Sequence, residues 1–333
     1  MVKVGVPRAL SYYRYFPMWK TMLEGMGARV VVSEPTGRAL LEEGVRHCVD
    51  DICVPVKLFF GHALSLKDKA DAIFVPRVVS VEKCDVDTYT CPKLIGLPDM
   101  IRGSLEGLPP VVEFVMDVQN RSLKASVKRL AANLGAPSSS AKKALAVSLE
   151  VQARYERELL RGLAPDSAMA KVLPNGNGGS KSNGAQDAHL RRDPVSIALV
   201  GHDYLVHDSF ISHDLPARLK KLGAEAVLMS EVPNSVIEHE IARYPEISWS
   251  YEKELLGAAS HFLGRQDIDG VMMVIGFACG PDSIIAEIIT REVRRPESPP
   301  LTTLVLDEHT GQAGVATRVE AFVDLIRRNR IKQ

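Results

Sequence analysis

The sequence has no excess of charge of either sign. Its 333 residues carry 41 Lys and Arg side chains against 41 Asp and Glu side chains, so the formal charge is zero. Such a chain has no overall field that would attract nucleic acid or an anionic membrane. We interpret the basic cluster at residues 327–330 as a solvated helix end, where cations are favoured. We therefore expect no nucleic-acid partner.

Long apolar runs are lacking as well. No stretch approaches the ~18 consecutive apolar residues that span a bilayer, and the opening MVKVGVPRAL has no signal-peptide pattern. We expect a cytoplasmic protein without a membrane partner. Hydrophobic residues make up 46% of the chain and charged residues 25%, a mixture typical of globular proteins, and the length suffices for two domains.

Paired cysteine motifs are absent, although the chain has five cysteines. An odd number of cysteines in a large chain of this kind argues against a disulfide framework and favours metal binding or redox chemistry. Without a CxxC…CxxC pattern, the cysteines do not fit a zinc ribbon. Neither half of the chain has a GxGxxG or GxxxxGK[ST] loop between its first strand and helix, which argues against nucleotide binding there.

Strand-like and helix-like segments alternate in two parts of the chain. Buried strands are expected at residues 2–6, 28–33, 72–76, 196–201, 225–230, 270–276 and 301–306. Helical patterns separate these runs, and strands that alternate with helices indicate a doubly wound parallel sheet. The sequence therefore predicts an α/β fold.

We place the domain boundaries by composition. Residues 1–108 and 194–333 form the two α/β domains, and residues 109–165 form a helical segment whose first helix begins near residue 111. Residues 166–193 are expected to be a flexible linker because Gly, Asn and Ser dominate most of that stretch. Such a composition buries too little apolar surface to offset the entropy lost on ordering.

Three cysteines share a local context. Cys53, Cys91 and Cys279 each have a proline one or two residues later. Proline suits the first turn of a helix, so Cys53 and Cys279 are expected just ahead of a helix N-terminus, where backbone N–H groups favour a thiolate. Thiolates from distant parts of a chain fit either an iron–sulfur cluster with one open iron or a zinc ion with an open position.

The other two cysteines lack this context. Cys48 lies near the end of the helical stretch LLEEGVRHC, and we interpret it as structural. Cys84 lies in the polar stretch EKCDVD and is a candidate additional ligand, with packing as the alternative. Burial as a small hydrophobe is the ordinary role of a cysteine that does no chemistry.

A cysteine nucleophile is a competing hypothesis. The stretch GFACG around Cys279 resembles a strand–turn–helix elbow, and Glu308 and His309 follow the next strand. A Cys279–His309 pair at neighbouring strand ends would suit a hydrolase. In either hypothesis Glu308 and His309 are the candidate catalytic residues, as proton donor or substrate contact, and a turn ahead of a helix is the alternative.

Further polar residues would lie near the site. Lys57 and His62 follow Cys53 and would supply a cation or hydrogen bonds around an anionic cluster, while Gly280 would shape the turn after Cys279. For Lys57 and His62, helix capping or exposure is the alternative. Arg8 and His202 follow the first strand of their halves and so occupy matching places.

Several long motifs resemble one family. They are GVPRALSYYRYFPMWKTMLEGMG, CVPVKLFFGH, FVPRVVSVE, CPKLIGLPDMI, GHDYLVHDSFI, GFACGPDSIIAE and LVLDEHTGQAGVATRVEAF. Together they resemble the 2-hydroxyacyl-CoA dehydratase superfamily, and within it the acyl-CoA dehydratase activase-related proteins. The resemblance implies two Rossmann-like domains that hold an iron–sulfur cluster between them. Its cluster positions match Cys53, Cys91 and Cys279.

The resemblance also implies a function and partners. A separate ATP-hydrolysing activase would deliver low-potential electrons to the cluster, and an oxygen-sensitive, anaerobic chemistry of the dehydratase or reductase type would follow. The cofactor would be a 4Fe-4S cluster, with a double-cubane cluster as the alternative. An acyl-CoA or other small molecule would be the substrate, and the chain would pair with itself or with a homologous subunit. A non-catalytic electron relay or assembly subunit is the alternative, since the chain shows no acyl-CoA recognition segment.

Overall fold

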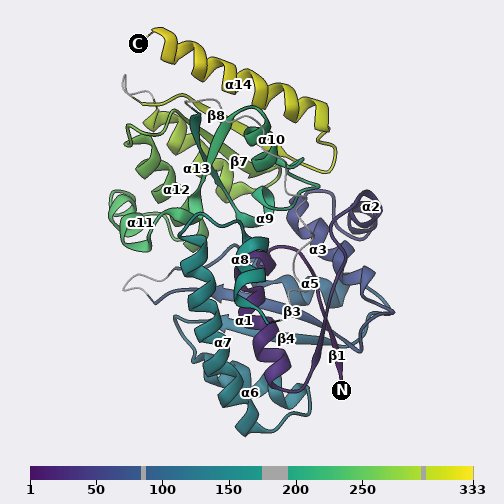
Figure 1. Cartoon of the computed structure of the whole chain (residues 1–333). Helices are drawn as coiled ribbons and strands as arrows, with labels where there is room; N and C mark the ends of the chain where they lie inside the picture. Colours follow the sequence, from purple (N-terminus) through teal and green to yellow (C-terminus); the bar gives the residue numbers. More distant parts are fainter. Residues whose placement is uncertain (84–87, 175–193, 294–297, 333) are drawn as a thin grey trace. The chain divides into compact units, whose positions relative to one another are not determined.

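The computed structural model describes residues 1–83, 88–174, 194–293 and 298–332, which form two compact α/β units (Figure 1). Unit 1 takes its described residues from Met1–Glu158, Pro165–Gly178 and Ser248–Tyr251. Unit 2 takes them from Leu159–Ala164, Gly179–Ile247 and Glu252–Gln333. Helices flank the parallel sheet of each unit, so the predicted α/β fold with two parallel sheets is confirmed.

Unit 1 is built on a sheet with the strand order β2-β1-β3-β4. Every pair of neighbouring strands in it is parallel. Its elements are β1 (Lys3–Val6), α1 (Tyr12–Gly25), β2 (Arg29–Val32), α2 (Arg38–Arg46), α3 (Val54–Ser65), β3 (Ala72–Ser80), α4 (Pro92–Ile95), α5 (Leu97–Ser104), β4 (Val111–Asp117), α6 (Leu123–Asn133), α7 (Ser138–Leu159) and α8 (Pro165–Val172).

Unit 2 is built on a sheet with the strand order β6-β5-β7-β8, again entirely parallel. Its elements are β5 (Val195–Gly201), α9 (Asp203–Val206), α10 (Leu215–Lys221), β6 (Ala224–Leu228), the 3-10 helix η1 (Met229–Glu231), α11 (Asn234–Ile241), α12 (Ser250–Leu263), β7 (Gly270–Gly276), α13 (Gly280–Glu292), β8 (Leu301–Leu306) and α14 (Gln312–Lys332).

The two sheets have the same topology. In each, the first strand of the unit lies in the interior, the second strand pairs on one side of it, and the third and fourth follow on the other side. The strand order therefore reverses between β1 and β3 and between β5 and β7. In open α/β sheets, ligands bind outside the carboxyl ends of the strands at such a switch point. This topology directs attention to the residues that follow β1, β3, β5 and β7.

The core of unit 1 is aromatic. Trp19 of α1 lies against Phe74 of β3, with ring centroids 5.2 Å apart, and Phe74 stacks on Phe114 of β4 at 6.2 Å. All three side chains are buried. Aromatic side chains bury the largest apolar areas of any residues, so this row contributes strongly to holding α1 against the sheet.

The core of unit 2 is mainly aliphatic. All seven residues of β7, GVMMVIG, are buried, which is typical of a central strand covered on both faces. Leu255, Ala259 and Phe262 of α12 pack in the same cluster as Met273. The continuous apolar run predicts this buried strand correctly, because both of its faces meet helices.

Helices α2 and α3 of unit 1 approach unusually closely. A Cβ atom at Gly44 would lie 1.9 Å from the backbone oxygen of Lys57, and one at Gly61 would lie 2.1 Å from that of Leu40. Real Cβ contacts do not come this close, so only glycine fits at either position. The two glycines thereby set the position of α3.

Two expectations for the middle of the chain are wrong. Residues 111–117 form strand β4 and not the start of a helix, which begins only at Leu123. An apolar run such as VVEFVMD does not by itself distinguish a strand from a buried helix. The expected linker at 166–193 begins with a helix, because α8 covers Pro165–Val172 and buries Ala168 and Met169. Residues 175–193 of that linker lie outside the described residues.

Among the described residues, no helix is both long enough and apolar enough to span a lipid bilayer.

Candidate functional site

The three cysteines singled out by proline context all begin helices. Cys53 is the N-cap of α3, Cys91 of the four-residue α4 and Cys279 of α13, and each helix has a proline in its first turn. The predicted position of Cys53 and Cys279 ahead of a helix N-terminus is confirmed. Whether any of these thiols binds metal stays a prediction. Cys84 lies outside the described residues.

Cys48, Cys53 and Lys57 lie near one another at the start of α3. Burial raises the pKa of Cys48 to about 12, with Lys57 lowering and Cys53 raising it to smaller extents. The Cys48 thiol therefore stays protonated at neutral pH, which agrees with a structural role. The buried ammonium of Lys57 donates to the backbone oxygen of Asp50 at 3.0 Å, so Lys57 is neither exposed nor a helix cap.

His62 of α3 is 0% exposed and lies between two hydroxyl groups. Its Nδ1 is 2.8 Å from Ser33 Oγ and its Nε2 is 3.0 Å from Thr36 Oγ1. Burial, aided by the charge of Arg8, lowers the pKa of His62 to about 3. The imidazole is therefore neutral, and it ties α3 to the segment that follows β2.

Arg8 follows β1 and is held by an ion pair within unit 1. Its Nη2 donates to Asp166 Oδ2 at 2.8 Å, and its guanidinium lies 5.7 Å from the ring centroid of Tyr12. The side chain is 12% exposed. Arg8 thus joins the end of β1 to helix α8, a segment that the sequence analysis assigned to a linker.

The turn after β8 contains the candidate catalytic residues Glu308 and His309. Asp307 Oδ1 accepts the backbone N–H of His309 at 2.9 Å and the hydroxyl of Thr310 at 2.8 Å. His309 is exposed and Glu308 half-buried. This is the hydrogen bonding of a turn, the alternative weighed for these residues. Their pairing with Cys279 in catalysis stays a prediction.

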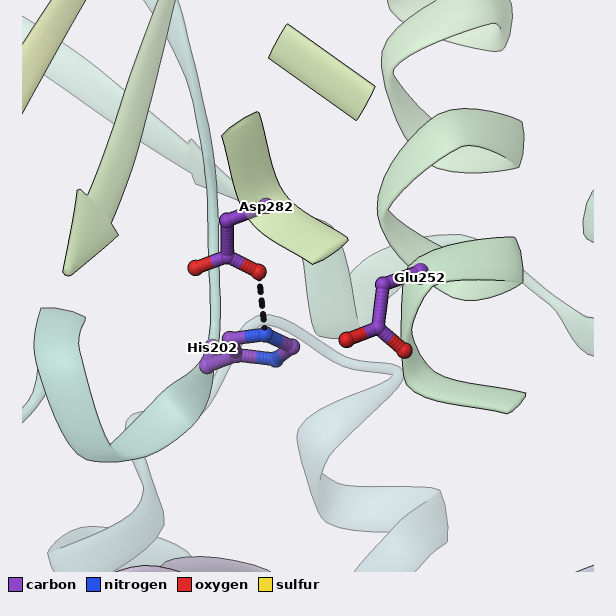
Figure 2. Close-up of side chains that lie close together, drawn as sticks. All are labelled: His202, Glu252 and Asp282. Atoms are coloured by element: carbon purple, nitrogen blue, oxygen red, sulfur yellow. Dashed lines mark hydrogen bonds and ion pairs between the residues drawn. The ribbon is translucent and has the colours of Figure 1, made fainter. Parts of the chain in front are cut away.

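Unit 2 brings His202, Glu252 and Asp282 together, and we call these three residues the His–Glu–Asp cluster (Figure 2). His202 follows β5 as the N-cap of α9, Asp282 lies in the first turn of α13, and Glu252 lies in the first turn of α12. His202 Nε2 and Asp282 Oδ1 are 2.9 Å apart. The cluster therefore lies at the switch point of the unit 2 sheet, where three helices begin.

The cluster is buried and strongly coupled. Burial opposes a charge on His202, but Asp282 beside it, with Glu252 and Asp203, raises the pKa of His202 to about 9. Burial also opposes ionisation of Asp282, yet the charge and hydrogen bond of His202 lower its pKa. Burial raises the pKa of Glu252. At neutral pH His202 and Asp282 therefore form an ion pair.

Cys279 belongs to the surroundings of this cluster. Its thiol interacts with Asp282, three residues along α13, and this hydrogen bond helps to lower the pKa of that carboxyl. Ala278 just before it has φ of 61°, a left-handed conformation that costs an L-residue about 1 kcal/mol. Gly280 opens α13, and a Cβ there would meet nothing within 4 Å. The strain of this turn therefore falls on Ala278.

Sequence reasoning found His202 and Cys279 but missed Glu252 and Asp282. The sequence places His202 only by its position after the first strand of its half, whereas its partners lie 50 and 80 residues further along the chain. The sequence contains one signal for them, since each is an acidic residue in the first turn of a helix. The pairing of β5 with the strand before Asp282 is known only from the sheet topology.

Comparison with known proteins defines the family only. No curated protein matches the chain. Among solved structures it is similar to the C-terminal domain of glucosamine-fructose-6-phosphate aminotransferase from Francisella tularensis, with 10% sequence identity and a TM-score of 0.22 over 97% of this chain and 81% of that one. A TM-score this low does not establish a shared fold. Residues 3–232, which include Cys53, Cys91 and His202, match a described family, and the chain therefore belongs to the family of the CoA enzyme activase uncharacterised domain (DUF2229).

Proposed function

We propose that the protein is an iron–sulfur protein that works with an ATP-hydrolysing activase of a CoA enzyme. The family to which the chain belongs is described by its relation to a CoA enzyme activase, which supports the activase partner. One observation carries the proposal. Cys53, Cys91 and Cys279 each stand at the N-cap of a helix that has a proline in its first turn.

The chemistry of these donors fits the proposed group. Iron–sulfur clusters are held by cysteine thiolates, and a helix N-terminus stabilises a thiolate through its backbone N–H groups and dipole. The starts of α3 and α13, helices of 12 and 13 residues, provide this environment for Cys53 and Cys279. When bound, the cluster would supply one-electron transfer at low potential.

The remaining residues would support the thiolates. The buried ammonium of Lys57, four residues after Cys53, lowers the pKa of Cys48, and its charge would likewise favour an anionic group at Cys53. The neutral imidazole of His62 fixes the position of α3 through Ser33 and Thr36, so it would orient Cys53 rather than act as a base. Cys48, whose thiol stays protonated, is not assigned to the cluster.

Anaerobic purification followed by iron and acid-labile sulfide analysis tests the proposal. We expect about four irons and four sulfides per chain for a single 4Fe-4S cluster. Serine substitutions at Cys53, Cys91 and Cys279 should each lower the iron content, whereas Cys48→Ser, the matched control, should leave it unchanged. A wild-type chain that stays colourless and free of iron after anaerobic reconstitution would contradict the proposal.

The partner is tested separately. We expect the reduced activase, in the presence of ATP, to bleach the visible absorption of the cluster in the wild-type chain. A subsequent change in the spectrum on adding an acyl-CoA thioester would identify an enzyme. Reduction of the cluster without any response to thioesters would identify an electron relay. A cluster that the activase does not reduce would contradict the proposal that the activase is its electron donor.

A further inference from the structure

The His–Glu–Asp cluster offers one nitrogen and two carboxylate oxygens to a common point. One ligand atom from each of His202, Glu252 and Asp282 lies within 4.8 Å of the other two. Three separate helix starts present the side chains, and Figure 2 shows the Glu252 carboxylate directed toward the imidazole. The positions are therefore set by the sheet and not by a mobile loop.

Two buried oxygens in the cluster are unsatisfied. Glu252 is 2% and Asp282 1% exposed, and neither Glu252 Oε2 nor Asp282 Oδ2 has a hydrogen-bond partner among the described residues. A buried carboxylate oxygen without a partner loses its hydration and gains nothing in exchange, so most such oxygens in proteins are hydrogen-bonded or bind an ion. The Glu252 carboxylate is directed toward His202 (Figure 2), and a cation bound among the three side chains would offset such unsatisfied carboxylate oxygens.

The charges point to a cation. Glu252 and Asp282, when ionised, contribute two negative charges in a region where Asp203 also acts on His202. A buried excess of negative charge is costly unless a cation offsets it. A divalent ion would displace the proton of His202 to solvent, and the ion with the neutral imidazole and the two carboxylates would then carry no net charge.

We propose that His202, Glu252 and Asp282 bind a single divalent transition-metal ion. Imidazole excludes the purely oxygen-seeking Ca²⁺ and Mg²⁺ as the preferred ions, and two carboxylates favour Mn²⁺, Fe²⁺ or Zn²⁺. Three protein ligands leave open positions, which a water molecule or a substrate oxygen would fill. The site takes none of its ligands from a cysteine, although the Cys279 thiol hydrogen-bonds to Asp282.

Titration with Mn²⁺, followed by the electron paramagnetic resonance signal of the free ion, tests the site. Mn²⁺ is the suitable probe because it binds thiolates poorly, so the cysteines do not compete for it. The 333-residue chain, stripped of metal by a chelator, should bind a single Mn²⁺ ion. The thermal unfolding temperature should also rise with the logarithm of the free Mn²⁺ concentration above the Kd, since the ion binds only the folded state.

Glu252→Gln removes one negative ligand and keeps the shape of the side chain. We expect it to weaken Mn²⁺ binding at least about tenfold, and His202→Gln to do the same. The matched control is Glu254→Gln, which changes the same charge two residues further along α12 but lies outside the cluster. Circular dichroism establishes that each variant is folded.

Two results would overturn the metal site. The first is a folded wild-type chain that binds no Mn²⁺. The second is a Glu252→Gln chain that binds Mn²⁺ as tightly as the Glu254→Gln control. Because the readout is the free manganese signal, neither result depends on whether an iron–sulfur cluster is present.

Discussion

Unit 1 buries His62 and unit 2 buries His202, and the two imidazoles are held in opposite protonation states. His62 meets the hydroxyls of Ser33 and Thr36, and its pKa falls to about 3. His202 meets the carboxylates of Asp282 and Glu252, and its pKa rises to about 9. Both side chains have lost nearly all contact with water, so burial alone does not decide the charge.

The difference shows what each histidine does. A neutral imidazole between two hydroxyls is a packing element that exchanges one hydrogen bond with each neighbour. An imidazolium between carboxylates is an electrostatic element, and removing one of its partners leaves a buried charge unpaired. The same residue type therefore supports the fold of unit 1 and builds a candidate site in unit 2.

The largest expected effect comes from removing the carboxylate beside His202. In metal-free protein, Asp282→Ala should lower the free energy of unfolding by about 3–5 kcal/mol at pH 7, because it leaves a buried imidazolium without its partner. Ser33→Ala removes two neutral hydrogen bonds, one with His62 and one from the backbone N–H of Arg8, and should cost about 1–3 kcal/mol. Urea unfolding of both variants measures the difference. Equal losses in the free energy of unfolding would contradict the opposite charge states of the two histidines.

Raising the pH should weaken unit 2 through His202. Its folded pKa of about 9 lies above the unfolded value of 6.5, so its stabilisation is complete below pH 6.5 and is lost as the pH rises through 9. The linked loss in free energy of unfolding is about 3 kcal/mol across that range. Denaturant titrations in a chelating buffer measure it, with His202→Gln as the control that should not show this loss. A pH-independent difference between the two chains contradicts the charged state of His202.

Lowering the pH should act through His62. Its folded pKa of about 3 lies below the unfolded value of 6.5, so the unfolded chain takes up a proton that the folded chain excludes. The free energy of unfolding should therefore fall by about 2 kcal/mol between pH 7 and pH 5 from this residue. A His62→Gln chain measured alongside should lose less over the same interval. If both chains respond alike, His62 is not the group responsible.

The smallest effect concerns the turn before Cys279. Glycine adopts the left-handed backbone of Ala278 without strain but has more freedom in the unfolded chain. The two effects nearly offset each other, so Ala278→Gly should stabilise the chain by less than about 1 kcal/mol. Thermal unfolding detects a gain of this size. A clear loss of stability would mean that the methyl group of Ala278 makes contacts that outweigh the strain.

Much of the fold follows from local sequence patterns. Buried runs such as SIALVG and GVMMVIG alternate with amphipathic helices, and this alternation is sufficient to predict two parallel sheets. The prediction of a helix over the run VVEFVMD is wrong, because neither the length nor the periodicity of such a run distinguishes a strand from a buried helix. Its partner, strand β3, lies more than thirty residues earlier in the chain, so no local pattern shows that the two pair.

Local sequence patterns predict less of the candidate site. The proline after Cys53 and Cys279 is a local signal, and it predicts the helix starts correctly. The contact between His202 and Asp282 depends on β5 lying beside β7. That pairing is a property of the sheet topology, and only the folded chain brings residues so far apart in the sequence to within hydrogen-bonding distance.

The glycine contact between α2 and α3 has a consequence for tolerance to mutation. Even a methyl group at position 44 would clash with the carbonyl of Lys57 and push apart two helices, the second of which has Cys53 as its N-cap. Variation at Gly44 or Gly61 would thus disturb the thiol from one or more helical turns away. In a survey of random variants, both glycines should behave like residues of the cysteine site, although neither carries any chemistry of its own.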